Sequence, residues 1–283
     1  MTRSVLHIGA HKTATTYMQA KLALNVDLLA ERGIRYDPLA KFRKNFTSIL
    51  NDPELREKAY LKRLRASISS QDVIMSDENM LGSPGNLVRS GVFYAQAKTR
   101  IRKVCRLTGV VNPEIFLALR DYAGFVVSMY SEYIRHREFM KFADFLELYQ
   151  KSEFSWLTVI SDVVEAAPTA RLFLWDFSSF RTLENTIFSQ MIGFDASELQ
   201  TPDGPVRESF SAPAMDVFET LAEILPAEEV RKTIGPVSRI LPKGDLYKAF
   251  DPLSADMTAS LKDAYRKDLE EISVRFPNVV FIK

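Results

Sequence analysis

Residues 4–19 read SVLHIGAHKTATTYMQ and decide the fold. The apolar run over residues 5–8 predicts a strand, Gly9 predicts the turn that ends it, and Thr15 and Thr16 predict the start of a helix. The loop between strand and helix carries Lys12. A helix N-terminus presents unpaired backbone N–H groups and a positive dipole, and a lysine beside it adds a full charge. The stretch therefore predicts a binding site for an anion such as phosphate or sulfate.

A Mg-ATP loop of the Walker type has a different pattern, G-x-x-x-x-G-K-[ST], with a second glycine directly before the lysine. Here Lys12 lies three residues after Gly9 and follows His11. This spacing argues against a nucleotide-dependent kinase of the P-loop type, which stays as the alternative enzyme class.

The stretch instead resembles the 5′-phosphosulfate loop of the sulfotransferase family, HIG-x-x-KTGTT-x-LQ. The matching residues are His7, Ile8, Gly9, Lys12, Thr13, Thr15, Thr16 and Gln19. The resemblance implies that the donor, 3′-phosphoadenosine 5′-phosphosulfate (PAPS), is bound by Gly9, Lys12, Thr13, Ala14, Thr15 and Thr16, and that the bisphosphate PAP is released as product. The family commonly has glycine where this chain has Ala14. Because alanine disfavours a positive φ, we expect right-handed helical geometry at Ala14.

A second motif follows the strand predicted for residues 114–119, EIFLAL. Arg120 stands at the end of this strand, Asp121 is expected to cap a helix that runs to about residue 137, and Ser128 lies eight residues after Arg120. This arrangement is similar to the R-N-P-x-x-x-x-x-S element of the same family, in which the arginine and the serine hold the 3′-phosphate. Asp121 and Tyr122 replace the family's asparagine and proline. A salt-bridged arginine and an unrelated helix serine are the alternative interpretation.

Carboxylates follow another predicted strand, the almost wholly apolar run DVIMS over residues 72–76. Ligands of open α/β sheets lie at the carboxyl ends of the strands, so acidic side chains there are placed for chemistry. The resemblance implies a catalytic base at this strand end, and Glu78 is the first choice. Asp77 and His11 stay open for the role, because the sequence does not show side-chain direction. The candidate catalytic residues are Lys12, Glu78 and His11, with a glutamate that merely caps a turn as the plain alternative.

The remaining segments alternate between strand and helix patterns. The sequence predicts strands at residues 33–38, 170–175 and 278–282, and helices at 16–31, 53–68, 182–192 and 254–276, with one or two helices within 142–166 and another that follows residue 85 and runs through residue 103. It also predicts a basic loop at 41–45 and loops at 82–85, 201–213, 235–236 and 242–244. We expect one domain over residues 1–283 with a three-layer α/β/α fold and a mainly parallel sheet. The resemblance implies the P-loop-NTPase-like sulfotransferase fold. It also makes Lys243 and Gly244 candidates for a loop that closes on the nucleotide.

Composition excludes several classes of protein. The 283-residue chain is 46% hydrophobic and 26% charged with a net charge of +1, which gives no reason to expect nucleic-acid binding. No segment approaches the ~20 apolar residues that a membrane span needs. One cysteine and three histidines offer neither a disulfide framework nor a metal cluster. We expect a cytoplasmic protein without a signal peptide or a metal, and its oligomeric state stays open.

The resemblance implies an enzyme that moves a sulfuryl group from PAPS to a hydroxyl or amine of a saccharide or small molecule. A sulfuryl group carries less negative charge than a phosphoryl group, so a lysine and backbone donors suffice without magnesium. Tyr17, Phe42, Phe93 and Tyr94 are candidates for an apolar acceptor pocket, although aromatic residues at such spacing more often belong to a core. A non-catalytic relative that binds a nucleotide or a glycan is a further alternative.

Overall fold

A parallel sheet forms the centre of the molecule. The computed structural model describes residues 2–52, 58–82, 92–150, 154–203 and 209–283. Within these residues, six strands pair in the order β2-β3-β1-β4-β5-β6, and every neighbouring pair is parallel. They are β1 (Ser4–Gly9), β2 (Ile34–Tyr36), β3 (Asp72–Ser76), β4 (Glu114–Leu119), β5 (Arg171–Asp176) and β6 (Val279–Phe281).

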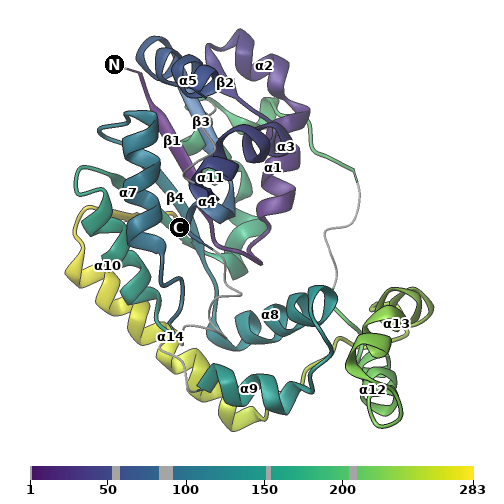
Figure 1. The fold of residues 1–283 in the computed structure, drawn as a ribbon. Coiled ribbons are helices and arrows are strands. Elements are labelled where there is room, and N and C mark those ends of the chain that lie inside the picture. The colour runs from purple at the N-terminus through teal and green to yellow at the C-terminus, as the bar shows by residue number, and fades with distance from the viewer. Residues whose placement is uncertain (1, 53–57, 83–91, 151–153, 204–208) are drawn as a thin grey trace.

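Helices cover both faces of the sheet (Figure 1). The described helices are α1 (Thr15–Leu24), α2 (Val26–Glu31), α3 (Leu39–Phe42), α4 (Ser48–Asn51), α5 (Lys58–Ser70), α7 (Ala97–Thr108), α8 (Tyr122–His136), α9 (Phe142–Gln150), α10 (Trp156–Ala166), α11 (Phe180–Ile192), α12 (Ala212–Leu221), α13 (Ala227–Ile240) and α14 (Ala255–Arg275). Single turns are η1 (Arg43–Thr47, a π-helix), and the 3₁₀ turns η2 (Glu78–Met80), η4 (Phe177–Ser179) and η5 (Ala196–Glu198). The predicted three-layer α/β/α fold with a parallel sheet is confirmed.

The two faces of the sheet lie in separate hydrophobic cores. Leu6 of β1 packs in one core with Ile101 of α7, and Val5, one residue earlier, packs in the other core with Phe188 of α11. Successive side chains of a strand point to opposite faces, so a strand covered on both sides must be apolar at nearly every position. All six residues of β1 are buried, as its sequence requires.

The strand order places a ligand crevice beside β1. The chain leaves β1 to build β2 and β3 on one side and then β4, β5 and β6 on the other. Loops that diverge in this way leave a gap at the carboxyl ends of the strands, which is where open α/β sheets bind ligands. The segments that meet at this edge are the loop before α1, the residues after β3 and the residue after β4.

Near the N-terminus, one sequence prediction holds except for a single interruption, and another is wrong. The helix predicted for residues 16–31 is divided into α1 and α2 at Asn25, whose buried amide donates to the carbonyls of Lys21 and Gln200. Asparagine competes for backbone groups in this way and so interrupts helices. The basic loop predicted for residues 41–45 belongs to α3 and η1, because Phe42 and Phe46 pack into the core and hold that segment helical.

The loop predicted at residues 235–236 is also wrong, because Gly235 and Pro236 lie inside α13. Val230 and Ile234 are buried one turn apart on that helix, and their packing outweighs the hydrogen bond that Pro236 cannot donate. Helix α12 begins at Ala212, inside the segment predicted to be irregular, with Ser211 as its cap. The parts of the predictions that fall on residues 53–57, 83–91, 151–153 and 204–208 lie outside the described residues. In the described part of the chain, no helix is both long and apolar enough to cross a membrane.

Candidate functional site

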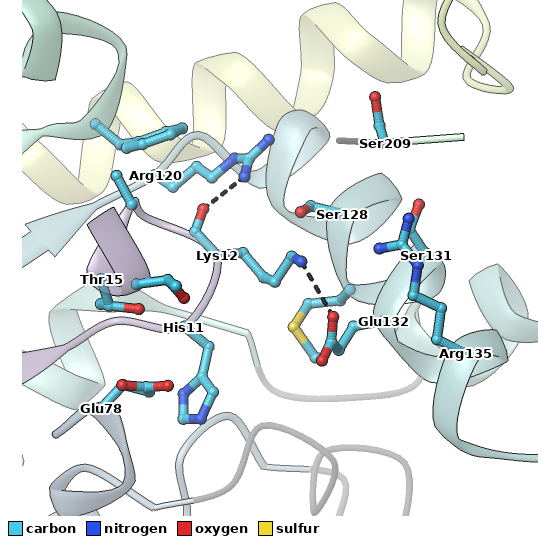
Figure 2. Close-up of a pocket in the computed structure, with 14 residues that line it drawn as sticks. His11, Lys12, Thr15, Glu78, Arg120, Ser128, Ser131, Glu132, Arg135 and Ser209 are labelled. Atoms are coloured by element: carbon cyan, nitrogen blue, oxygen red, sulfur yellow. Dashed lines mark hydrogen bonds and ion pairs between the residues drawn. The ribbon is translucent and has the colours of Figure 1, made fainter. Parts of the chain in front are cut away.

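A cavity of about 190 Å³ opens at the carboxyl edge of the sheet (Figure 2). Eight of the sequence-predicted site residues line it, and they come from three separate segments: His11, Lys12, Ala14, Thr15, Thr16, Glu78, Arg120 and Ser128. Gly9 and Thr13 do not line the cavity. Lys243 and Gly244 lie elsewhere, in an exposed turn.

The loop that precedes α1 leaves the first N–H groups of the helix facing this cavity. The first residue to donate a bond within the helix is Met18, whose N–H reaches the carbonyl of Ala14 at 3.0 Å. No side chain caps the N-terminus of α1, whereas Asp121 caps α8 and Ser254 caps α14. Orphan N–H groups at the start of a helix are donors for an anion. Lys12 and Ala14 both have positive φ, 64° and 62°, a loop geometry that turns backbone N–H groups inward.

The prediction of right-handed geometry at Ala14 is therefore wrong. The loop is held by contacts on either side: the Thr13 hydroxyl donates to the carbonyl of Ala10 at 2.6 Å, and the Arg120 guanidinium donates to the carbonyl of Lys12 at 2.6 Å. One contact within the loop and one from the distant Arg120 together override the local preference of alanine. A left-handed residue is what the glycine of the resembled motif would accommodate without strain.

Replacing Ala14 with glycine is expected to stabilise the protein by about 0.5–1 kcal/mol. The left-handed conformation costs a non-glycine residue about 1–2 kcal/mol, and the larger entropy of an unfolded glycine offsets part of the gain. Urea unfolding measures the difference. Ala20, exposed in the middle of α1, is the matched control, and Ala20→Gly should cost about 1 kcal/mol. If both variants destabilise the protein equally, Ala14 is not strained.

Lys12 reaches across the cavity to α8. Its ammonium lies 3.2 Å from the Glu132 carboxylate, whose other oxygen lies 3.1 Å from Nε2 of His136. Only 17% of the Lys12 side chain is exposed. Burial lowers the pKa of Lys12, and the attraction of Glu132 opposes this shift. An anion that enters the cavity would replace the Glu132 carboxylate as the partner of Lys12.

Arg120 lies at the end of β4 and connects three parts of the site. Its guanidinium donates to the carbonyl of Lys12 and packs 4.9 Å from the ring of Phe177, and its own carbonyl accepts a bond from the Trp156 indole. Ser128, two turns into α8, lines the same cavity (Figure 2). The Asp121 side chain caps α8 as predicted, through the N–H of Gly124 at 2.7 Å.

The two acids after β3 are in different surroundings. Asp77 is fully buried and accepts bonds from Arg43, from the Thr47 hydroxyl and from the N–H of Asn79, so it is committed to structure. Glu78 lines the cavity. Its carboxylate accepts bonds from Gln19 at 2.9 Å and from Arg43 at 2.8 Å.

Glycine at position 9 allows this placement of Glu78. The φ of Gly9 is +112°, and a Cβ on it would lie 3.0 Å from the Cβ and 3.2 Å from the Cα of Glu78. Any other residue would push the strand end away. Gly9 thus acts by letting two chain segments approach closely, and its conformation is one that only glycine adopts readily.

His11 stands between Lys12 and the Glu78 turn. Its backbone N–H donates to the Tyr94 hydroxyl at 3.0 Å, and its Nδ1 lies 3.0 Å from the same oxygen. Burial lowers the pKa of His11, although the charge of Glu78 opposes this shift. The imidazole lies at the cavity wall, which keeps His11 as the second candidate for the base.

Besides Met129, three polar or charged cavity residues on α8 were not predicted from the sequence: Ser131, Glu132 and Arg135. They follow Ser128 by three, four and seven residues, which is the spacing of one helix face. Helical periodicity from Ser128 would have found them. Phe177 and Ser209 also line the cavity, and their place follows only from the tertiary fold.

The four aromatic residues named as candidates for an apolar acceptor pocket do not line this cavity. Phe42, Phe93 and Tyr94 are core residues with at most 2% exposure. The Tyr17 hydroxyl donates to Glu184 at 2.7 Å and lies outside the cavity lining. Most of the residues that line the cavity are polar or charged, and Met129 and Phe177 are its larger apolar members. Among the described residues, no group of three or more His, Cys, Asp or Glu side chains is arranged to hold a metal ion.

Comparison with known proteins gives a distant likeness in fold. No protein-family model matches the chain, and no curated protein matches it. Among solved structures, a sulfotransferase from Alicyclobacillus acidocaldarius aligns over 86% of this chain and 97% of its own length, with 13% identity and a TM-score of 0.40. A likeness this distant carries no argument about activity, which has to come from the site itself.

Proposed function

We propose that the protein is a sulfotransferase that uses PAPS and transfers its sulfuryl group to a hydroxyl or amine of a polar acceptor, a saccharide or a small molecule. The observation that carries the proposal is the meeting of two motifs at one cavity. Lys12 and the uncapped start of α1 come from the first motif, and Arg120 and Ser128 come from the second, more than a hundred residues later.

The donor set fits a nucleotide with phosphate groups at both ends. Lys12 and the N–H groups of α1 would hold the 5′-phosphosulfate, with the hydroxyls of Thr15 and Thr16 beside them. Arg120 and Ser128 would hold the 3′-phosphate. When bound, the donor supplies an activated sulfuryl group whose leaving phosphate gains negative charge. Fixed positive groups aimed at that phosphate stabilise the transition state, which is the largest contribution such a site can make.

Glu78 is the proposed base for the acceptor. Burial raises the pKa of Glu78, but the charge of His11, the hydrogen bond from Gln19 and the charge of Arg43 outweigh burial and leave this pKa below its ordinary value. The carboxylate is therefore ionised at neutral pH. In this state it can accept the proton of the acceptor as the new S–O or S–N bond forms. The product acid then returns the proton to solvent through the open cavity.

The kinase alternative meets a specific difficulty at Thr13. In a Walker loop the hydroxyl that follows the lysine binds the magnesium ion of Mg-ATP. Thr13 follows Lys12, but its side chain is fully buried and its hydroxyl donates to the carbonyl of Ala10. The hydroxyl faces away from the cavity, so it does not match that role.

Arg120→Ala tests the assignment of the 3′-phosphate. The variant is expected to weaken binding of 3′,5′-bisphosphoadenosine by about 2–3 kcal/mol, the scale of a lost charge-assisted hydrogen bond. Binding of adenosine 5′-monophosphate, which lacks the 3′-phosphate, should barely change. Calorimetric titration of both nucleotides with both proteins gives the difference.

Equal losses for the two nucleotides would assign Arg120 another role. The bond from Arg120 to the carbonyl of Lys12 would then be its main contribution, because a disordered Lys12 loop weakens the 5′ end of either ligand. The comparison of two ligands thus separates recognition of the phosphate from support of the loop.

A further inference from the structure

We propose that Arg43 is a positioning residue that keeps the Glu78 carboxylate ionised and fixed at the cavity wall, with buried Asp77 as its anchor. The inference rests on the proposed function, in which Glu78 is the base. Arg43 belongs to neither sequence motif and lies outside the cavity lining. It comes from the π-helical turn η1, on a different segment from Glu78.

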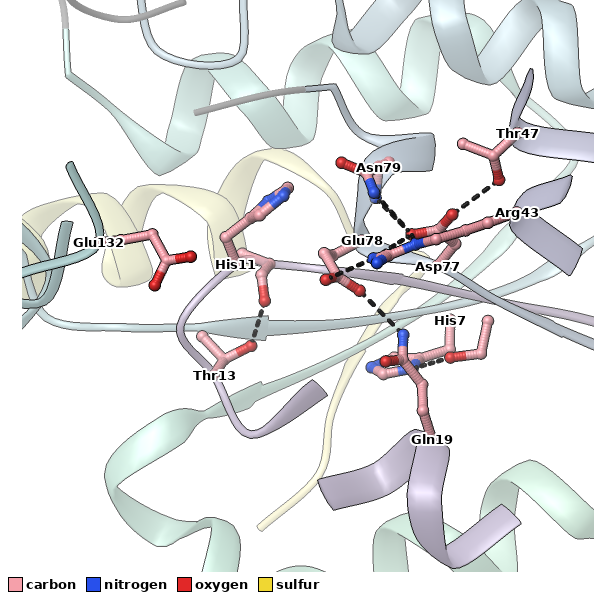
Figure 3. Close-up of polar contacts among 12 residues, drawn as sticks. His7, His11, Thr13, Gln19, Arg43, Thr47, Asp77, Glu78, Asn79 and Glu132 are labelled. Carbon is pink, nitrogen blue, oxygen red and sulfur yellow. Dashed lines mark hydrogen bonds and ion pairs between the residues drawn. The ribbon is translucent and has the colours of Figure 1, made fainter. Parts of the chain in front are cut away.

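The guanidinium of Arg43 bridges the two acids that follow β3 (Figure 3). Its NH2 group lies 2.8 Å from Oε1 of Glu78 and 3.0 Å from Oδ1 of Asp77, and its Nε lies 3.2 Å from the same Asp77 oxygen. On the other side, Gln19 of α1 donates to Oε2 of Glu78 at 2.9 Å. Each oxygen of the carboxylate thus has one fixed donor, which determines where the group points.

Asp77 explains why Arg43 stays in place. The Asp77 side chain is fully buried, and its second oxygen accepts a bond of 2.7 Å from the Thr47 hydroxyl. Arg43 and Thr47 are the first and last residues of η1, so the turn is held to the strand end at both of its ends. A buried carboxylate must be paired, and breaking such a pair is strongly destabilising. The arginine that satisfies Asp77 is therefore also held against Glu78.

The charges around Glu78 come from several elements. The titratable groups that interact with it are His11 in the loop, Arg43 in η1, the neighbouring Asp77, and the buried His7, Tyr36 and Tyr94. Burial lowers the pKa of His7 to about 4, so this side chain is neutral near pH 7. Among these groups, Arg43 is the permanent cation, and it lies in direct contact with the carboxylate. Removing it takes away one of the attractions that oppose desolvation, so the pKa of Glu78 should rise.

The test is a direct titration of Glu78 together with the pH dependence of turnover. In Arg43→Gln, the pKa of Glu78, followed by ¹³C NMR of its carboxyl carbon, should rise by about one unit or more, the usual effect of losing an adjacent arginine. The acidic limb of the pH–rate profile should move upward by the same amount. Arg43→Lys, which keeps the charge, should restore most of the low pKa.

Two further variants complete the design. Lys44 is exposed on the same turn, and Lys44→Gln removes one positive charge without removing the contact, so it should leave both titrations unchanged. If Arg43→Gln alone does not fold, the double variant with Asp77→Asn replaces it, because no buried charge is then left unpaired.

An unchanged Glu78 pKa in a folded Arg43 variant would overturn the inference, and so would an equal shift in Lys44→Gln. A shift in the NMR titration without a shift in the pH–rate profile supports the role of Arg43 and instead removes Glu78 from catalysis. The NMR readout thus tests Arg43 independently of whether Glu78 is the base.

Discussion

Glu78→Gln is expected to lower turnover by about 10²–10⁴-fold, the usual contribution of a general base, while nucleotide binding survives. Glutamine keeps the shape of the side chain and can accept the bond from Gln19 or Arg43 through its amide oxygen. It cannot take a proton. Initial rates at saturating donor and a calorimetric titration with 3′,5′-bisphosphoadenosine separate the two effects.

His11 provides the contrasting experiment. His11→Ala should retain more activity than Glu78→Gln, because Nδ1 of the His11 ring is already in a hydrogen bond with the Tyr94 hydroxyl. A Glu78→Gln enzyme with normal turnover, beside a His11→Ala enzyme that has lost it, would transfer the base role to His11. Asp77 is a poor candidate for the base because its carboxylate already accepts hydrogen bonds from Arg43 and Thr47.

Lys12→Ala is expected to lower turnover by about 100-fold or more, since it removes a charge that stabilises the leaving phosphate. The fold should tolerate the change, because Glu132 keeps His136 as a partner and 17% of the Lys12 side chain is already exposed. Turnover at saturating donor is the measurement, with a thermal melt as the check on folding. Near-normal turnover in a folded variant would remove Lys12 from the mechanism.

The strands and the two motifs were predictable because their signals are local. The apolar runs at residues 72–76 and 114–119 match β3 and β4 residue for residue. Parallel strands place their carboxyl ends at one edge, so the residue types at positions 78 and 120 indicated that they belong to one site. Lys12 and Arg120 also follow parallel strands, so the sequence predicted that they belong to the same site.

The parts that could not be predicted depend on contacts between distant segments. Ala14 adopts a left-handed conformation against the local preference of alanine, and Arg120, which is distant in the sequence, holds the loop through the carbonyl of Lys12. Arg43 reaches Glu78 only because η1 packs against the end of β3. The position of Glu132 in the site could have been predicted, because it lies four residues after Ser128 and therefore on the same face of the helix. Lys243 and Gly244 were inferred from a dipeptide that is common in turns, and they lie in an exposed turn away from the cavity.

The most direct test of the proposed function is the binding of 3′,5′-bisphosphoadenosine to the wild-type protein, compared with that of Mg-ATP, by calorimetric titration. The proposal predicts saturable binding of one bisphosphate per chain that needs no magnesium and is at least about tenfold tighter than binding of Mg-ATP, because a lost phosphate contact costs more than 1.4 kcal/mol. Tighter binding of Mg-ATP, or no binding of the bisphosphate, would contradict it.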